Sequence, residues 1–274
     1  MKPVDFDYVR AATLAEASQL LCQEETSAKI VAGSQSLGPM LNLRLVQPGL
    51  LIDITAIPEL CRVEETAEGV ILGACVTHAD IEDGRVPDPT GGVLARIARG
   101  IAYRGVRNRG TIGGSLGHAD PAADWVSTLS ALGADILIYG SGQRRILGAD
   151  AFITGAFETA LSVGEIVEAV RIPRLSKGAR WGYCKLCRKP GEFAYAMCAT
   201  LTDCERRVRR VVVGALDSSP IVVDAAGAPE SGRSHTEIAL GSIEKILDDR
   251  GVTEPVGRQL HIAAFKRAMA QAGQ

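Results

Sequence analysis

Apolar and polar positions alternate in blocks along the first 57 residues, and these blocks predict a small unit of strands and one helix. Apolar side chains recur at helical spacing after Thr13, which forms a capping-box pattern with Glu16, and they predict a helix over 14–24. The apolar runs AKIVAG and LLIDIT predict short buried strands, whereas the polar stretch GSQSLGPMLNLRL predicts a loop with a returning segment. We therefore predict a βαβ-like unit over 1–57.

The pattern beyond Pro58 predicts a second unit of mixed strands and helices. The predicted elements are strands at 62–65 and 70–75 and helices from Thr77, over 92–100 and over 125–132. The glycine-rich run RNRGTIGGSLGHADPAAD predicts a loop before the last of these helices, and ADILIYG predicts a strand after it. GEIVEAVRIPR predicts the strand that closes the unit, which we place at 58–175 because Pro173 and the turn SKGAR follow.

A third unit is predicted over 176–274. WGYCKLC and RVRRVVVGAL predict strands, and Ser234 with Glu237 forms a second capping-box start. The last predicted helix runs through QLHIAAFKRAMAQ, with apolar residues at 260, 263, 264 and 268. The order of elements along the three units predicts an α+β fold class.

Composition and charge exclude several classes of function. The chain has 274 residues, which is more than one hydrophobic core usually serves. Its residues are 46% hydrophobic and 23% charged, and this composition excludes a disordered protein. A formal net charge of -2 gives no basic excess for nucleic acid or anionic membranes, so we expect neither as a partner. No apolar stretch approaches the roughly 20 residues of a bilayer span, and MKPVDFDYVR lacks the apolar core of a signal peptide. We expect a cytoplasmic protein.

Seven cysteines are scattered at 22, 61, 75, 184, 187, 198 and 204, which predicts free thiols rather than a disulfide framework. Cys184 and Cys187 form a CxxC pattern, and one interpretation makes them half of a zinc or iron–sulfur site completed by Cys198 and Cys204. The surrounding WGYCKLC pattern predicts a strand, which directs 184 and 187 to opposite faces. We therefore favour the absence of a metal site.

Two glycine-containing segments suit an anion such as a phosphate. They consist of Ala32, Gly33, Ser34, Gln35 and Ser36 after a predicted strand and of Thr111, Ile112, Gly113, Gly114 and Ser115 before a predicted helix. Glycine lets backbone amides converge on an oxygen, and hydroxyls add donors, although a glycine after a strand is more often only a turn. The chain contains no GxGxxG fingerprint and no P-loop, so neither common nucleotide motif is supported.

Four motifs in order, AGSQSLGPMLNLRL, RNRGTIGGSLGHADPAADW, GEIVEAVRIP and YCKLCRKPGEFAYA, resemble one protein family. The chain resembles the FAD-binding medium subunit of molybdenum hydroxylases, the flavoprotein chain of carbon monoxide dehydrogenase and its relatives. The same domain occurs within xanthine dehydrogenase. The resemblance extends from about residue 3 to about residue 270. It implies a two-subdomain FAD-binding domain of the PCMH/VAO-like type followed by a small α+β C-terminal domain.

The resemblance also implies an extended FAD between the first two units, its pyrophosphate held by both glycine segments. Asp124 of the HADPAAD motif is expected to accept hydrogen bonds from the flavin nucleotide, and an alternative interpretation makes Asp120 and Asp124 helix caps. Lys185 is expected near the flavin, with Phe193 shielding one face of its ring. The implied cofactor-binding residues are Ala32, Gly33, Ser34, Gln35, Ser36, Thr111, Ile112, Gly113, Gly114, Ser115, His118, Asp120, Asp124, Val167, Lys185 and Phe193.

The chain departs from the family pattern at two positions of these segments. Relatives have AGG in the first segment where this chain has Ser34, and the second segment commonly ends in Asn where this chain has Ser115. A Cβ at 34 must be accommodated by the loop, which leaves FAD affinity and redox potential open. Arg107 and Arg109 flank the second segment, and the sequence does not decide whether they serve phosphates or a partner.

The function implied by the resemblance is that of an electron-transfer subunit. A large molybdenum subunit would oxidise the substrate, a small [2Fe-2S] subunit would pass on electrons, and the FAD of this chain would reduce an external acceptor, with the complex a dimer of heterotrimers. No catalytic acid, base or metal ligand is then required here. Two alternatives stay open, a self-contained FAD-dependent oxidoreductase and an adaptor protein without cofactor. The sequence of this chain identifies neither the substrate of the complex nor the terminal electron acceptor.

Overall fold

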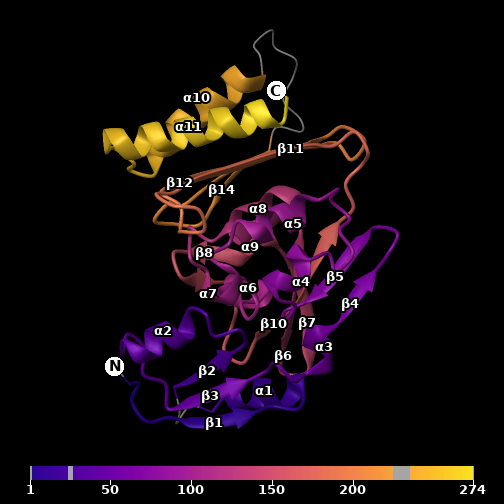
Figure 1. Cartoon of the computed structure of the whole chain (residues 1–274), viewed down its shortest axis with the longest axis vertical. Coiled ribbons are helices and arrows are strands. Elements are labelled where there is room, and N and C mark those ends of the chain that lie inside the picture. Colours follow the sequence, from indigo (N-terminus) through magenta and orange to yellow (C-terminus); the bar gives the residue numbers. More distant parts are fainter. Residues whose placement is uncertain (1, 24–26, 225–234, 274) are drawn as a thin grey trace.

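The described residues form four β-sheets, and the three sheets with more than two strands are stacked along the long axis of the molecule (Figure 1). The computed structural model describes residues 2–23, 27–224 and 235–273. A three-stranded sheet lies at one end, a five-stranded sheet in the middle, and a four-stranded sheet covered by two long helices at the other end. The structure therefore has the predicted α+β class.

The first sheet is parallel with strand order β1-β3-β2. Its elements are β1 (Asp7–Arg10), α1 (Leu14–Leu21), β2 (Ala28–Val31), α2 (Leu37–Asn42) and β3 (Leu50–Asp53). Thr13 caps α1, because its Oγ1 accepts from the Glu16 N–H at 3.1 Å. The predicted loop at GSQSLGPMLNLRL is wrong in part: it contains α2, which tolerates Pro39 because the first turn of a helix needs no intrahelical donor.

The middle sheet is antiparallel with strand order β4-β5-β10-β6-β7. The elements of this part are α3 (Pro58–Cys61), β4 (Val63–Glu65), β5 (Gly69–Gly73), α4 (His78–Glu82), α5 (Val93–Arg99), α6 (Arg104–Arg107), α7 (Ile112–His118), α8 (Asp124–Leu132), β6 (Asp135–Gly140), β7 (Gln143–Gly148), α9 (Ala149–Phe152), β8 (Ile153–Gly155), β9 (Glu158–Thr159) and β10 (Ile166–Pro173). The strand predicted from GEIVEAVRIPR is β10, and it lies at the centre of the sheet.

The glycine-rich run predicted as a loop contains helix α7, so that prediction is corrected. Glycine is a poor helix former, but tertiary contacts hold this helix in place. Thr111 caps its first turn, and the N–H of Ile112 donates to the Val76 carbonyl at 3.0 Å. The predicted helices at Thr77, over 92–100 and over 125–132 are confirmed as α4, α5 and α8.

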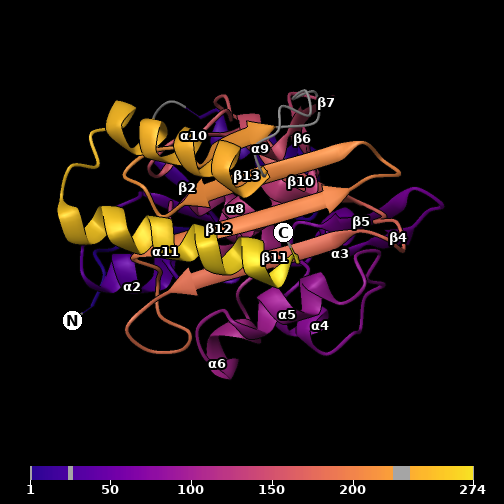
Figure 2. The same ribbon diagram turned by 90° about the horizontal axis from the view of Figure 1, so that it is seen from above.

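The third sheet is antiparallel with strand order β11-β12-β13-β14. Its elements are β11 (Arg180–Leu186), β12 (Ala196–Asp203), β13 (Val208–Gly214), β14 (Ile221–Asp224), α10 (His235–Asp249) and α11 (Pro255–Gln271). Helices α10 and α11 lie across the outer face of this sheet (Figures 1 and 2). Helix α8 packs against its inner face. The predicted capping residue Ser234 lies outside the described residues.

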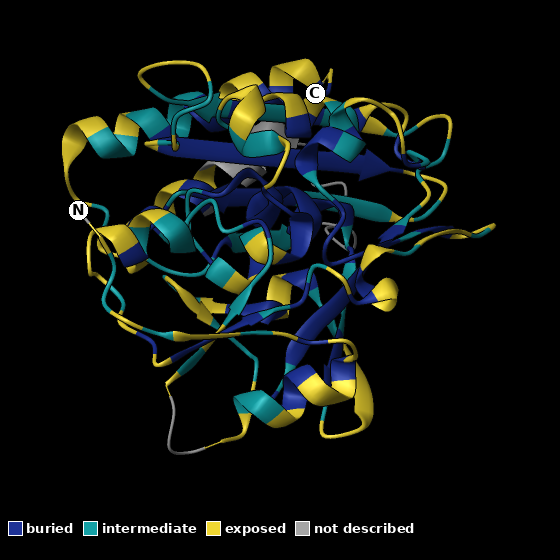
Figure 3. Ribbon diagram, turned by 60° about the horizontal axis from the view of Figure 1, so that its bottom comes forward, coloured by how far each residue is buried: buried dark blue, intermediate teal, exposed yellow. Residues whose placement is uncertain are grey.

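Most strands carry buried residues, and the exposed residues gather on loops and on the outer faces of helices (Figure 3). The largest core joins the first two sheets and contains the fully buried Trp125 and Phe152. A second core, centred on Phe265 of α11, lies between the C-terminal helices and their sheet. Within the described ranges, no helix is long and apolar enough to span a bilayer.

Candidate functional site

A cavity of about 1180 Å³ is lined by residues of all three sheet regions. Its size exceeds the roughly 300–1,000 Å³ of sites for drug-sized ligands. Fifteen residues predicted to bind a cofactor line it: Ala32, Gly33, Ser34, Gln35, Ser36, Thr111, Gly113, Gly114, Ser115, His118, Asp120, Asp124, Val167, Lys185 and Phe193. The sixteenth, Ile112, does not, because its side chain is fully buried in the core. Residues more than 160 positions apart in the sequence thus meet at one site.

The first glycine segment (32–36) presents unpaired backbone donors to this cavity. Ser34 has φ of 57°, and the Gly38 N–H donates to its carbonyl at 3.0 Å, so the chain turns sharply here. Across the described parts of the chain, no acceptor is paired with the N–H groups of Ser34, Gln35 or Ser36. Successive amides around a left-handed residue form a concave anion-binding nest. This segment therefore fits a phosphate group.

Replacing Ser34 by glycine should stabilise the protein by about 1 kcal/mol, because glycine adopts positive φ without the Cβ penalty. The measurement is the free energy of unfolding in urea. Ser34→Ala is the matched control, since it keeps a Cβ and should bring no gain. Equal stability of the glycine variant and the parent would show that the loop holds Ser34 without strain.

The second glycine segment (111–115) differs, because its backbone donors from Ile112 to Ser115 are already engaged. The N–H groups of Ile112, Gly113 and Gly114 donate to the Val76 carbonyl, the Ala74 carbonyl and Thr111 Oγ1 at 3.0, 2.9 and 3.0 Å. The segment forms the first turn of α7 and contributes a hydroxyl at Ser115 together with small residues along the cavity wall. We predicted converging amides in both segments, and among the described residues the run of three successive free amides is that of the first.

Asp124 joins the second and third sheet regions. Its Oδ1 accepts from Tyr183 Oη at 2.7 Å, and its Oδ2 accepts from Lys185 Nζ at 2.8 Å. Both donors lie two residues apart on β11 and so point to the same side of the strand. Burial raises the pKa of the Asp124 carboxyl despite the opposing effects of Lys185 and Tyr183. Tyr183 was missed in the sequence because a strand tyrosine carries no signal of its own.

The alternative interpretation made Asp120 and Asp124 caps of α8, and the structure places neither of them at the N-cap. The N-cap residue is Ala123, which has no capping side chain, and Asp124 is the first helical residue. Asp120 Oδ1 accepts from the Ala122 N–H at 2.8 Å and closes the turn before the helix. Neither carboxylate occupies the N-cap position, and both line the cavity.

A buried histidine that no sequence motif marked also lines the cavity. His78 is 5% exposed, and its Nδ1 accepts from Trp125 Nε1 at 3.1 Å. Burial, with a smaller effect of the Arg107 charge, lowers the pKa of His78 to about 4. The imidazole is therefore neutral at physiological pH. The signal for it was the Trp125 that follows the HADPAAD motif, whose indole needs an acceptor when buried.

The low pKa of His78 makes stability depend on pH. The unfolded chain binds a proton at His78 near pH 6.5 and the folded chain only near pH 4, so stability is complete above pH 6.5 and falls as pH drops toward 4. We expect His78 to account for a loss of about 1.5 kcal/mol between pH 6.5 and 5. Urea unfolding of the parent and of His78→Asn at both pH values measures it. Identical pH dependence of the two proteins would contradict this assignment.

The two arginines left open by the sequence lie outside the cavity lining. Arg107 is nearly buried, forms an ion pair with Glu82 at 2.7 Å, and donates to the carbonyls of Ile101 and Ala102 at 3.0 and 3.2 Å. It therefore holds the 101–102 turn in place. Arg109 is exposed, and its backbone contacts the first glycine segment at Gly33.

Three exposed aromatic side chains surround the mouth of the cavity, and we call them the aromatic rim: Tyr103, Phe193 and Tyr195. They are 72%, 62% and 61% exposed. The Ala102 N–H donates to the Gly191 carbonyl at 3.0 Å, which ties the loop carrying Phe193 to the loop carrying Tyr103. The rim is thus assembled from the second and third sheet regions.

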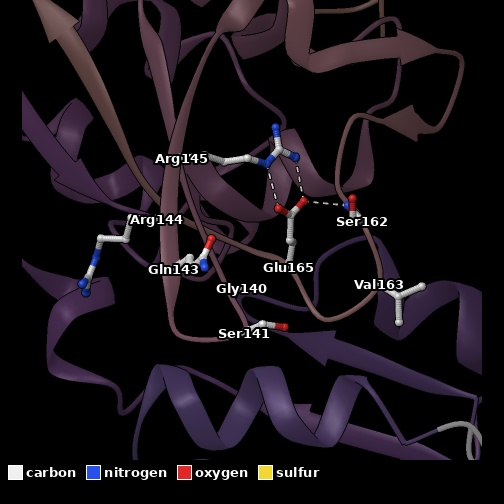
Figure 4. Close-up of a pocket in the computed structure, with 8 residues that line it drawn as sticks. All are labelled: Gly140, Ser141, Gln143, Arg144, Arg145, Ser162, Val163 and Glu165. Carbon is white, nitrogen blue, oxygen red and sulfur yellow. Dashed lines mark hydrogen bonds and ion pairs between the residues drawn. The ribbon is translucent and has the colours of Figure 1, made fainter.

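A second, smaller cavity of about 320 Å³ lies beside the β6–β7 turn (Figure 4). Arg145, which lines this cavity, forms an ion pair with Glu165, with 2.6 Å between Arg145 Nη2 and Glu165 Oε2. Glu165 lines both this cavity and the large one. Arg145 is the main cause that lowers the pKa of Glu165 to about 2. The guanidinium is therefore neutralised within the protein, and this pocket offers a weaker site for an anion than the large cavity does.

The cysteines are free thiols, three of them buried. Cys184 pairs with Cys198 across β11 and β12, and both are buried. Burial raises the pKa of the Cys198 thiol well above its ordinary value, so this thiol stays protonated and does not act as a thiolate ligand. Among the residues that the structure describes, no group of three His, Cys, Asp or Glu side chains is placed to hold a metal ion.

Comparison with known proteins gives the family. Residues 4–175 match the family described as the FAD binding domain in molybdopterin dehydrogenase. The chain is 38% identical over 201 residues to the carbon monoxide dehydrogenase medium chain of Hydrogenophaga pseudoflava, covering 73% of this chain and 70% of that one. It is 35% identical over 265 residues to the nicotine 6-hydroxylase medium subunit of Paenarthrobacter nicotinovorans, covering 93% of both chains.

The solved structures agree with this match. The carbon monoxide dehydrogenase structure from Hydrogenophaga pseudoflava superposes with a TM-score of 0.89 at 32% identity, covering 100% of this chain and 99% of that chain. The likeness therefore includes the four-stranded sheet and the helices beyond residue 175. This chain belongs to the family of FAD-binding medium subunits of molybdopterin dehydrogenases.

Proposed function

We propose that this chain holds FAD in the 1180 Å³ cavity and serves as the electron-transfer subunit of a heterotrimeric molybdenum hydroxylase. The observation that carries the proposal is the convergence of the two glycine segments, Asp124 and Lys185 on one cavity. The relatives named above are medium chains of dehydrogenases and hydroxylases, which supports the same assignment.

The cavity fits the parts of an extended dinucleotide. The amides of Ser34, Gln35 and Ser36 have no acceptor within the described ranges and would hold the pyrophosphate. Lys185, anchored by Asp124, would place an ammonium group beside the flavin ring. Phe193 of the aromatic rim would cover one ring face and keep water from it.

FAD, when bound, supplies the ability to accept and release electrons singly or in pairs. The chain's own contribution is to bind the cofactor, to hold a cation near the ring and to leave one edge of the cavity accessible. The exposed aromatic rim at that edge is suited to the apolar centre of a protein interface. We propose that a small [2Fe-2S] subunit docks here and that a large subunit carries the molybdenum cofactor, in a dimer of heterotrimers.

The test is purification of the chain from cells that also express its partner chains. Heating the product should release a yellow compound identified as FAD, and two further chains with iron and molybdenum should co-purify. The chain expressed alone should bind FAD and fail to reduce dye acceptors with carbon monoxide, aldehydes or N-heterocycles. Substrate-dependent dye reduction by the lone chain would support a self-contained oxidoreductase instead, and absence of flavin from both preparations would support an adaptor.

A further inference from the structure

The buried pair His78 and Trp125 lies beneath the second glycine segment and has no part in the function proposed above. We infer that His78 is a further ligand-contacting residue, whose Nε2–H donates a hydrogen bond to a phosphate oxygen of the dinucleotide in the cavity. This inference rests on the proposed function, and it assigns a donor to the wall of the cavity opposite the first glycine segment.

The hydrogen bond from Trp125 determines which imidazole nitrogen carries the proton. An indole N–H is only a donor, so His78 Nδ1, at 3.1 Å from it, must be the acceptor. In a neutral imidazole the proton then resides on Nε2. The pKa of His78, lowered to about 4, keeps the ring in this neutral form. Trp125 thus fixes Nε2 as a hydrogen-bond donor.

The packing directs that donor toward the cavity. Trp125 is fully buried and lies outside the cavity lining, whereas His78 belongs to the lining, so the Nδ1 edge faces the core and the opposite edge faces the cavity. A Cβ at Gly110 would lie 3.0 Å from Nε2, which places Nε2 next to another residue of the lining. Over the described ranges, no acceptor is paired with Nε2.

The surroundings of His78 indicate that the acceptor for its Nε2–H is an anionic oxygen of a ligand near the two glycine segments. The His78 N–H donates to the Gly110 carbonyl at 2.9 Å, and Thr77 pairs with Thr111. The His78 ring lies beside Gly110, which directly precedes the second segment. The backbone donors of that segment at 112–114 are engaged elsewhere. Gly33 contacts the chain at 109–110, which brings the first segment close. A pyrophosphate between them would accept from amides on one side and from His78 on the other.

Two substitutions separate this role from a structural one. The Asn side chain in His78→Asn places an oxygen near the position of Nδ1, so it retains the acceptor for Trp125 and removes the outer donor. The Gln side chain in His78→Gln places an amide N–H near the position of Nε2, so it retains the donor and loses the Trp125 contact. We expect His78→Asn to weaken FAD binding by about tenfold or more, and His78→Gln to bind nearly as the parent does. Thermal stability should follow the reverse order.

The ligand panel shows which part of the dinucleotide is contacted. Isothermal titration measures the affinities of the parent, both variants and the control His261→Asn for FAD, ADP and riboflavin. We expect His78→Asn to lose affinity for FAD and ADP and to keep its affinity for riboflavin. His261 is buried in the core of the third sheet region, outside the cavity, so its replacement should leave all three affinities unchanged. Affinities that follow thermal stability across the variants would overturn the inference.

A spectroscopic measurement gives a second, independent outcome. The chain has four histidines, so a ¹⁵N spectrum of histidine-labelled protein is resolvable. The His78 signals should show the tautomer protonated at Nε2, and addition of ADP should shift the Nε2 resonance while Nδ1 stays near its position. An unshifted Nε2 signal at saturating ADP would refute the contact. Failure of the parent to bind FAD or ADP at all would instead refute the proposed function.

Discussion

Replacing Gly33 by alanine should destabilise the protein by about 3 kcal/mol or more and abolish its retention of FAD. A Cβ at this position would overlap the carbonyl oxygen of Arg109 and lie 2.7 Å from the Gly110 Cα. Both contacts are with backbone, so no side-chain rotation relieves them. The first glycine segment and the chain at 109–110 would have to separate, and the nest of free amides at 34–36 would open with them. Urea unfolding and the flavin content of the purified protein measure the two effects.

Gly49 offers a matched control for this prediction. A Cβ there would meet no atom within 4 Å, and its φ lies outside the left-handed region. Gly49→Ala should therefore change the free energy of unfolding by less than about 0.5 kcal/mol and leave the flavin content unchanged. If Gly33→Ala behaved like Gly49→Ala, Gly33 would not be in the close contact with the chain at 109–110 that the structure shows.

Much of the fold was predictable because helix and strand periods in the first two units are clear. The strand β12 was missed, since all its residues from Ala196 to Asp203 are buried and the alternation that marks a half-exposed strand is absent. Helix α7 was missed because three glycines in seven residues argue against a helix, and Thr111 with the carbonyls of Ala74 and Val76 overrides that propensity.

The candidate site was predictable where a motif carried it and not where the fold assembled it. The glycine segments, Asp124 and Lys185 came from their motifs and meet at the cavity. Tyr183 and His78 are isolated polar residues in the sequence, and only the approach of β11 to α8 and of α4 to α8 gives them partners. Ile112 was included because it lies within a motif, although its apolar side chain belongs to the core.

Removing the carboxylate in Asp124→Ala should destabilise the protein by about 3–5 kcal/mol, because it leaves the ammonium of Lys185 nearly buried without its counter-ion. The side chain of Lys185 is 10% exposed, so solvent compensates little. Tyr183 loses its acceptor in the same variant. Urea unfolding of Asp124→Ala, Lys185→Met and the double variant forms the cycle, with the exposed Lys189→Met as control. Additive losses would show that the ion pair contributes nothing beyond its separate members.

Lys185→Met should cost less than Asp124→Ala, because a buried carboxyl can become neutral by taking up a proton while it still accepts from Tyr183. Burial already raises the pKa of Asp124 against the effect of Lys185, and removal of the lysine raises that pKa further.

A carboxyl whose pKa is higher in the folded than in the unfolded chain contributes stability at low pH, and this contribution is lost as pH rises through the folded pKa. The deficit of Lys185→Met relative to the parent should therefore shrink from pH 8 to pH 5, whereas the deficit of Asp124→Ala, which has no such carboxyl, should not. A deficit of Lys185→Met that stays constant over this range would mean that Asp124 remains ionised without its lysine, held by solvent that reaches it through the cavity.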